Sequence, residues 1–253
     1  MKPTYPELRN MAREIVATLP RPKFCSLFKD EITISKELLF TNPMLVKLKN
    51  QISTLLQDDF GHGMLHSELV AVDAGAIIQI EREKLAEKLP LERAMLLVQT
   101  AGLLHDIKRK EKYHSKQGAI FAKKILRNAC YDLTMEEIEI VCNAIHNHEA
   151  FQDEETIPLP FSLISDALYD ADKFRWGPDN FTHTVWDMVI FANIPLADFL
   201  LGFPKGMKKL SQIRNTFRTE TGKTYGPGFI DLGLEAGELL ATKLQKHHSG
   251  LFP

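Results

Sequence analysis

The sequence predicts an all-α protein. Helical patterns recur along the whole chain, and the alternation that is typical of strands is almost absent. Two specific helix starts support this prediction: a capping box at residues 134–137 and an N-cap followed by proline at Asn42-Pro43. Only residues 31–34 have strand character, and we expect a short strand or an extended loop there.

The helices are expected between glycine, proline and polar breaks. The prediction is for helices at about residues 6–19, 42–56, 64–89, 91–107, 114–128, 134–149, 162–174 and 183–202, with a last one ending near 248. Loops are expected at 58–63, where two glycines flank His62, and at the Gly-Pro-Gly of 226–228. The break after 174 is a Trp-Gly-Pro sequence.

Bulk properties exclude several classes of protein. The net charge of −2 provides no global field that would favour nucleic acid or an anionic membrane. The three cysteines are scattered and lack CxxC spacing, which fits a reducing cytosol and predicts a cytoplasmic protein. The N-terminus lacks the apolar core of a signal peptide. The apolar stretch 185–203 is interrupted by polar residues and proline, so we expect a buried helix pair and no membrane span.

The most informative stretch is Leu-Leu-His-Asp-Ile at residues 103–107. An apolar run from 94 to 104 leads into it, and the predicted helix is apolar nearly all round, so it should be central. Adjacent helical residues point about 100° apart, so His105 and Asp106 can share a metal only if it lies across the helix end. A buried imidazole and carboxyl group are unfavourable unless something satisfies them, and a divalent metal would do so.

Other histidines are expected to face the same core. His66 opens an apolar stripe on its helix, and His148 lies at the edge of the stripe on the 134–149 helix. His114 stands at a helix start, eight residues after Asp106. Taken singly, each is more often a hydrogen-bonded core residue than a ligand. The prediction of a metal site therefore rests on the set.

One further acid is expected from the 162–174 helix, where Asp170 and Asp172 compete. Helical periodicity puts neither at the centre of the apolar face and leans slightly toward Asp170, so the pattern leaves the choice open. Imidazole and carboxylate donors without thiolate suit Mn, Fe, Co, Ni, Zn or Mg. We therefore expect one or two divalent ions.

The ordered set of residues resembles the HD-domain metal-dependent phosphohydrolase superfamily, in particular bacterial HD hydrolases. The order His…His-Asp…Asp is represented by His66, His105-Asp106 and Asp172, and the family's Ala-Asp-basic segment selects Asp172 over Asp170. Residues 61–66, 114–126 and 140–148 match further segments of the family, whereas Leu69 replaces an arginine found in many relatives. The resemblance implies metal ligation by these four residues: His66, His105, Asp106 and Asp172.

The resemblance also implies an architecture. We expect a single helical domain over residues 1–253, with an HD-like metal-binding core at about 50–180. Helical extensions are expected at 1–49 and 181–253, and neither has a counterpart in the family.

The expected activity is hydrolysis of a phosphate ester or anhydride of a small molecule, such as a nucleotide, by a metal-activated water. Asp106, His114 and His148 are the predicted catalytic residues. The two histidines either bind a second metal bridged by Asp106, or contact the phosphate and the leaving group as donors or general acid. The sequence favours one metal slightly.

Several cations are candidates for binding the phosphate. Arg109, Lys110 and Lys173 lie near the ligands in sequence, although a solvated charged loop is an equal alternative for them. A basic segment at 205–223 could close over an anionic substrate, but a plain surface helix is the stronger interpretation.

Two other functions compete with the phosphohydrolase. Some HD proteins are di-iron oxygenases that use four histidines and two aspartates, and the chain has a sufficient set. The other is a non-catalytic, metal-bound sensor or interaction module. The intact ligand set argues against the latter, because a retired site has no physical need to keep buried acids and imidazoles together.

Overall fold

The computed structural model describes residues 3–56, 63–85, 89–128, 131–152, 158 and 160–247. It confirms the all-α prediction, because these residues form twelve α-helices and no strand. The helices are α1 (Tyr5–Thr18), α2 (Lys23–Leu27), α3 (Lys29–Thr41), α4 (Pro43–Ile52), α5 (Met64–Ile80), α6 (Leu91–Leu104), α7 (His114–Leu126), α8 (Met135–His146), α9 (Phe161–Phe174), α10 (Val185–Phe191), α11 (Leu196–Ile213) and α12 (Glu220–His247).

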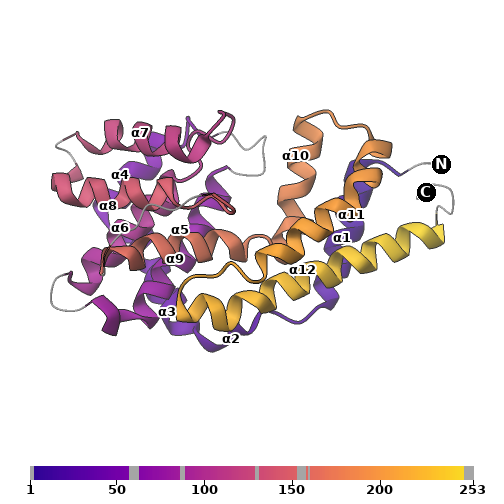
Figure 1. Cartoon of the computed structure of the whole chain (residues 1–253), viewed down its shortest axis with the longest axis horizontal. Coiled ribbons are helices and arrows are strands. Elements are labelled where there is room, and N and C mark those ends of the chain that lie inside the picture. Colours follow the sequence, from indigo (N-terminus) through magenta and orange to yellow (C-terminus); the bar gives the residue numbers. More distant parts are fainter. Residues whose placement is uncertain are drawn as a thin grey trace.

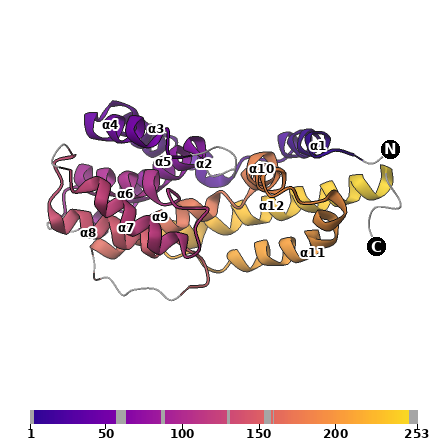
Figure 2. The same ribbon diagram turned by 90° about the horizontal axis from the view of Figure 1, so that it is seen from above.

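The helices gather in two halves of an elongated molecule (Figure 1). The half drawn on the left holds α3 to α9, and the other half holds α1, α10 and α11. Helix α12 runs along both and packs on α9 at its start and on α1 and α11 further along. Seen from above, α10 lies between α1 and the α9 end of the core (Figure 2). The first helix of the chain therefore packs with the last ones.

Both specific helix starts are confirmed. Thr134 and Glu137 form the predicted capping box at the start of α8, with Glu137 Oε2 accepting from the Thr134 amide at 2.8 Å. The Asn42 side chain accepts hydrogen bonds from the amides of Met44 and Leu45, which begins α4 at Pro43.

The core is centred on α5 and α6, which are the most extensively packed pair of helices. From Ala94 to Leu104 every residue of α6 is buried, as its unbroken apolar run predicts. The two helices approach closely at Gly102, where a Cβ atom would lie 2.7 Å from the Cα atom of Ala71. The close approach holds the C-terminal end of α6, and thus the His-Asp pair, against α5.

Two expectations about secondary structure are wrong. Residues 31–34 are helical and belong to α3, where Ser35 and Leu39 are buried one turn apart, so helical packing overrides the local β-propensity. Residues 226–228 lie inside α12 instead of forming a loop. A side chain at Gly226 would meet the Phe217 ring at 2.5 Å, so this glycine allows tight packing within the helix.

Helix ends also differ from the prediction. The helix expected to reach residue 89 ends at Ile80 and continues as a 3₁₀ turn at Arg82–Leu85. The segment expected at 183–202 begins with a π-helical turn at Asn180–Thr184, continues as α10 and breaks before α11. It is a helix pair, but it is not buried as expected, because Ile190 is 46% and Leu201 is 62% exposed. The expected loop at 58–63, including His62, lies almost entirely outside the described residues.

Among the described residues, no helix combines the length and the apolar character needed to cross a membrane.

Candidate metal centre

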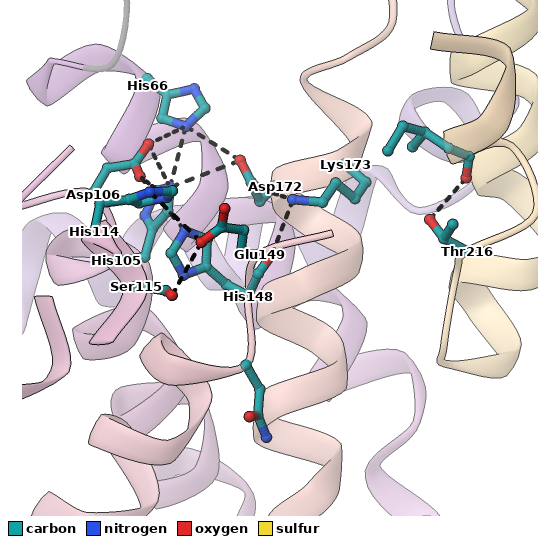
Figure 3. Close-up of polar contacts among 12 residues, drawn as sticks. His66, His105, Asp106, His114, Ser115, His148, Glu149, Asp172, Lys173 and Thr216 are labelled. Carbon is teal, nitrogen blue, oxygen red and sulfur yellow. Dashed lines mark hydrogen bonds and ion pairs between the residues drawn. The ribbon is translucent and has the colours of Figure 1, made fainter. Parts of the chain in front are cut away.

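The predicted ligands meet at the ends of five helices (Figure 3). Each of these residues lies within one turn of the end of its own helix. The set comprises His66 in the first turn of α5, His105 and Asp106 directly after α6, His114 as the first residue of α7, His148 just after α8, and Asp172 in the last turn of α9.

A first group joins His66, His105 and Asp172. The Nε2 atoms of His66 and His105 lie 3.2 Å apart, and Asp172 Oδ1 lies 3.4 Å from His66 Nε2. All three side chains are buried, and their donor atoms lie within 4.8 Å of one another. Two imidazole nitrogens and a carboxylate oxygen at this spacing can coordinate one divalent ion.

A second group joins Asp106, His114 and His148, whose donor atoms also lie within 4.8 Å of one another. Asp106 stands between the two groups. Its Oδ2 atom is 3.3 Å from His105 Nε2, whereas its Oδ1 atom is 3.5 Å from His148 Nε2 and 3.7 Å from His114 Nε2. Each oxygen of one carboxylate thus faces a different pair of histidines.

Backbone carbonyls orient two of the histidines. His105 Nδ1 donates to the carbonyl of Gly102 at 2.8 Å, and His148 Nδ1 donates to that of Ile145 at 2.6 Å. With the proton held at Nδ1, the Nε2 atom of each neutral ring carries the lone pair and faces the centre. Gly118 permits the arrangement, because a Cβ there would lie 3.2 Å from the His105 carbonyl oxygen.

The electrostatics favour neutral rings for His114 and His148 and an ionised carboxylate for Asp172. Burial, aided by the Arg109 charge, lowers the pKa of His114 to about 4, and burial also lowers the pKa of His148. Burial alone would raise the pKa of Asp172, but Lys173 and His66 hold it well below its usual value. Burial opposes the charge of His105 as well, yet Asp106 and Asp172 raise its pKa, so these acids attract positive charge. A cation in the centre would satisfy them.

Asp170 has a different environment from Asp172. It accepts hydrogen bonds from the amides of Arg218 and Thr219, both at 2.8 Å, and from the Thr219 hydroxyl at 2.7 Å. Burial raises its pKa to about 7 despite these three donors. Helical periodicity placed Asp170 slightly closer to the apolar face, which agrees with its complete burial. The residue anchors the segment that leads into α12 and lies outside both ligand groups.

The three predicted phosphate-binding cations separate in space. Arg109 Nη1 donates to His114 Nε2 at 2.8 Å, and Lys173 Nζ donates to Asp172 Oδ2 at 2.5 Å. Both residues line the cavity above the ligands. Lys110 is not among the lining residues, and its ammonium lies 4.6 Å from the centroid of the Phe191 ring. Of the basic segment at 205–223, Lys209 and no other cation lines the described cavity.

A cavity of about 490 Å³ opens at the ligands and extends beneath α10 and α11. Its lining includes His66, Asp106, His114, His148 and Asp172 at one end. The far wall comes from the segment between residues 180 and 210. Sequence patterns did not reveal this wall, because apolar residues at helical spacing are also what a buried core requires.

Glu149 is a further site residue that the sequence did not single out. Its Oε2 atom lies 3.7 Å from His114 Nδ1 and accepts a hydrogen bond from the Ser115 hydroxyl at 3.2 Å. In the sequence, its position directly after the candidate ligand His148 could have identified it. Glu149 is placed to orient the His114 ring from the side opposite to the centre.

The donor set fits a divalent metal. Four imidazoles and two carboxylates converge in a buried site without a thiolate, which suits first-row transition metals or magnesium. The protein is thus a helical bundle with a His/Asp centre that could hold divalent metal ions.

Comparison with protein families identifies the class more closely. Residues 62–176 match the HD domain family, which confirms the resemblance that the motifs indicated over this part of the chain. An HD domain implies the superfamily of metal-dependent hydrolases. A comparison with curated proteins and one with solved structures each return no match.

Proposed function

We propose that the protein is a metal-dependent phosphohydrolase that cleaves a phosphate ester or anhydride of a small molecule, using two ion sites that share Asp106. The observation that carries this proposal is the position of the Asp106 carboxylate. Its two oxygens face different histidine pairs, which suits a carboxylate that bridges two ions. This geometry supports two ions more than the single ion that the sequence slightly favoured.

A bound divalent ion would lower the pKa of a water to about 7 and polarise a phosphoryl oxygen. The protein's own part is to hold the reactants. Asp106 and Asp172 would provide the negative charge that holds the ions, and the cations of Arg109 and Lys173 would donate to the phosphate. Phosphoryl transfer depends largely on such positioning and charge neutralisation.

Arg109 also bears on the choice between the two roles of His114. Because the arginine donates to His114 Nε2, this nitrogen carries a lone pair and not a proton. It is therefore suited to ligation and not to general acid catalysis in this state. Ligation would require the Arg109 side chain to rotate away, toward the cavity in which the phosphate would bind.

A di-iron oxygenase is the second candidate, because the four histidines and two aspartates that it needs converge here. One observation favours the phosphohydrolase. Arg109 and Lys173 both line the cavity next to the ligands, and their donors match an anionic phosphate. Oxygen activation has no need for two cations at this position.

Metal analysis and a substrate panel test the proposal together. Protein purified without added metal should contain a divalent metal, and with Mn, Co, Ni or Mg it should hydrolyse phosphomonoesters, phosphodiesters or nucleotides. Asp106→Ala should lose both metal and turnover. Asp231→Ala is the control, because Asp231 pairs with Arg214 on the surface and should be dispensable.

Three results would contradict the proposal. Absence of turnover with every metal and substrate, despite tight metal binding, would favour a sensor module. Iron together with an oxygen-dependent, phosphate-free reaction would favour the oxygenase. Retention of metal and activity by Asp106→Ala would mean that the site is assigned to the wrong residues.

A further inference from the structure

The two ends of the cavity differ in chemistry. The end at the metal centre is lined by imidazoles, carboxylates, Arg109 and Lys173. The far wall is predominantly apolar and comes from the π-helical turn, α10 and α11. It includes Phe181, Val185, Met188, Phe199, Phe203 and Met207. A single ligand that fills this cavity must therefore present an anionic group at one end and an apolar group at the other.

The apolar wall is open to a ligand. Phe199, Phe203 and Met207 lie on one face of α11 at helical spacing, and all three are only partly buried. They pack against the core on one side and border the cavity on the other. Apolar surface left facing water is unfavourable in proportion to its area, so an apolar ligand would gain free energy by covering it.

Two glycines of α11 keep the space open. Gly202 and Gly206 are one helical turn apart and both line the cavity. A Cβ atom at either position would meet no other atom within 4 Å. Glycine inside a helix is less favourable than alanine, so the helix itself gains nothing from these two residues. Side chains at these positions would project into space that the cavity otherwise offers to a ligand.

The polar groups of the far wall are few for recognising a nucleoside or a sugar. Asn180, Thr184, Asp198 and Lys209 also line the cavity, but they are spread over two helical segments, the π-helical turn and α11, among the apolar side chains. A nucleobase or sugar would bury many donors and acceptors, and each one left unpaired would weaken binding. An aliphatic or simple aromatic group has no such requirement. The volume of about 490 Å³ lies in the range of small-molecule sites.

We propose that the substrate is a phosphate ester of a hydrophobic alcohol, whose apolar group is bound by α10 and α11. This inference rests on the proposed phosphohydrolase function and specifies its substrate class. In the reaction a bond forms between phosphorus and the water oxygen, the ester phosphorus–oxygen bond breaks, and the leaving alkoxide takes up a proton. The products are inorganic phosphate and an apolar alcohol.

Binding of a series of n-alkylphosphonates, from ethyl to decyl, tests the inference without requiring turnover. Isothermal titration calorimetry with the metal-loaded protein should show affinity rising about fourfold for each added methylene until the apolar end is filled. The values of kcat/KM for the matching n-alkyl phosphates should rise in the same order. Adenosine monophosphate and glucose 6-phosphate should be poorer substrates than octyl phosphate.

Variants of the glycines connect this selectivity to the wall. Gly202→Phe and Gly206→Phe should reduce the affinity for decylphosphonate at least tenfold and leave that for ethylphosphonate within twofold. Gly228→Phe is the matched control, since Gly228 is a glycine of α12 with equally open surroundings, but it does not line the cavity. Phe203→Gln provides a second variant that keeps much of the side chain's length while removing its apolar character.

The outcomes separate this inference from the proposed function. Hydrolysis of ethyl phosphate with no dependence on chain length would overturn the inference and leave the phosphohydrolase intact. Binding of long phosphonates without hydrolysis of any phosphate would support the apolar site and contradict the phosphohydrolase. Failure of the metal-loaded protein to bind any long phosphonate would overturn the inference. Unchanged selectivity for chain length in Gly202→Phe, Gly206→Phe and Phe203→Gln would also overturn it.

Discussion

The two ends of the cavity differ in how strongly the rest of the fold holds them. At the metal end, five of the six candidate ligands are buried, and His105 and His148 are held by backbone carbonyls. At the apolar end, α10 and α11 meet at a break near Pro195, and side chains such as Ile190 and Leu201 are exposed. Ligands that are held rigidly keep the geometry that catalysis requires, whereas a less buried wall can adjust to the shape of a substrate.

The largest expected effect separates Asp170 and Asp172, two acids of α9 that helical periodicity could not distinguish. Asp172→Ala should reduce kcat/KM by at least about a hundredfold, because even residues that merely support a metal ligand change activity by about 10–100-fold. It should also reduce the metal content and leave the buried Lys173 without its carboxylate partner. Metal analysis and steady-state kinetics of the purified variant measure both effects.

Asp170→Asn provides the contrast. Asn cannot accept all three hydrogen bonds from residues 218 and 219 as well as a carboxylate, so the free energy of unfolding should fall by about 1–3 kcal/mol. For a chain of this length the melting temperature should fall by about 2–10 °C. Metal content and activity per folded molecule should stay close to those of the unmodified protein. A loss of metal in Asp170→Asn with metal retained in Asp172→Ala would reverse the assignment.

A smaller effect should divide the metal end itself into its two groups. His114→Ala removes a ligand of the second group and leaves His66, His105 and Asp172 in place. The variant should bind about half as much metal and lose about 10–100-fold in kcat/KM. Titration with cobalt, followed by visible absorption, would count the sites. If the unmodified protein binds one ion and His114→Ala binds the same amount, His114 contacts the substrate and the bridging role of Asp106 is wrong.

The metal end could largely be predicted from the sequence. A buried imidazole or carboxyl group is rare in a core, so the position of His105-Asp106 after an apolar run is informative in the sequence alone. Periodicity could not choose between Asp170 and Asp172, because both are buried and the difference lies in their partners. Only the family motif identified Asp172, which the structure brings to the histidines.

The apolar end could not be predicted in this way. Phe199, Phe203 and Met207 fit the same helical pattern as residues that fill a core, and whether a cavity lies beside them depends on how α11 packs. The strand expected at 31–34 and the loop expected at 226–228 failed for a related reason. Tertiary packing, including the contact of Phe217 with Gly226, outweighed the local signals.

The smallest effect separates Arg109 from Lys110, two adjacent cations that the sequence treated as equivalent. Arg109 lies in the cavity and donates to His114, whereas Lys110 lies over Phe191 outside the cavity lining. Arg109→Ala should reduce kcat/KM by about tenfold, mainly through KM, because a charge-assisted bond to phosphate is worth about 1.5–3 kcal/mol at most and water replaces part of it. Lys110→Ala is the matched control and should change kcat/KM by less than about twofold, since substitutions of surface charges are usually within about 0.5 kcal/mol. The affinity for metal gives a second readout, and it should rise where kcat/KM falls. With the competing guanidinium removed from His114 Nε2, the second group should bind its ion more tightly in Arg109→Ala than in the unmodified protein. Weaker metal binding in this variant, or equal losses of activity in the two variants, would show that Arg109 does not exchange between the histidine and the phosphate.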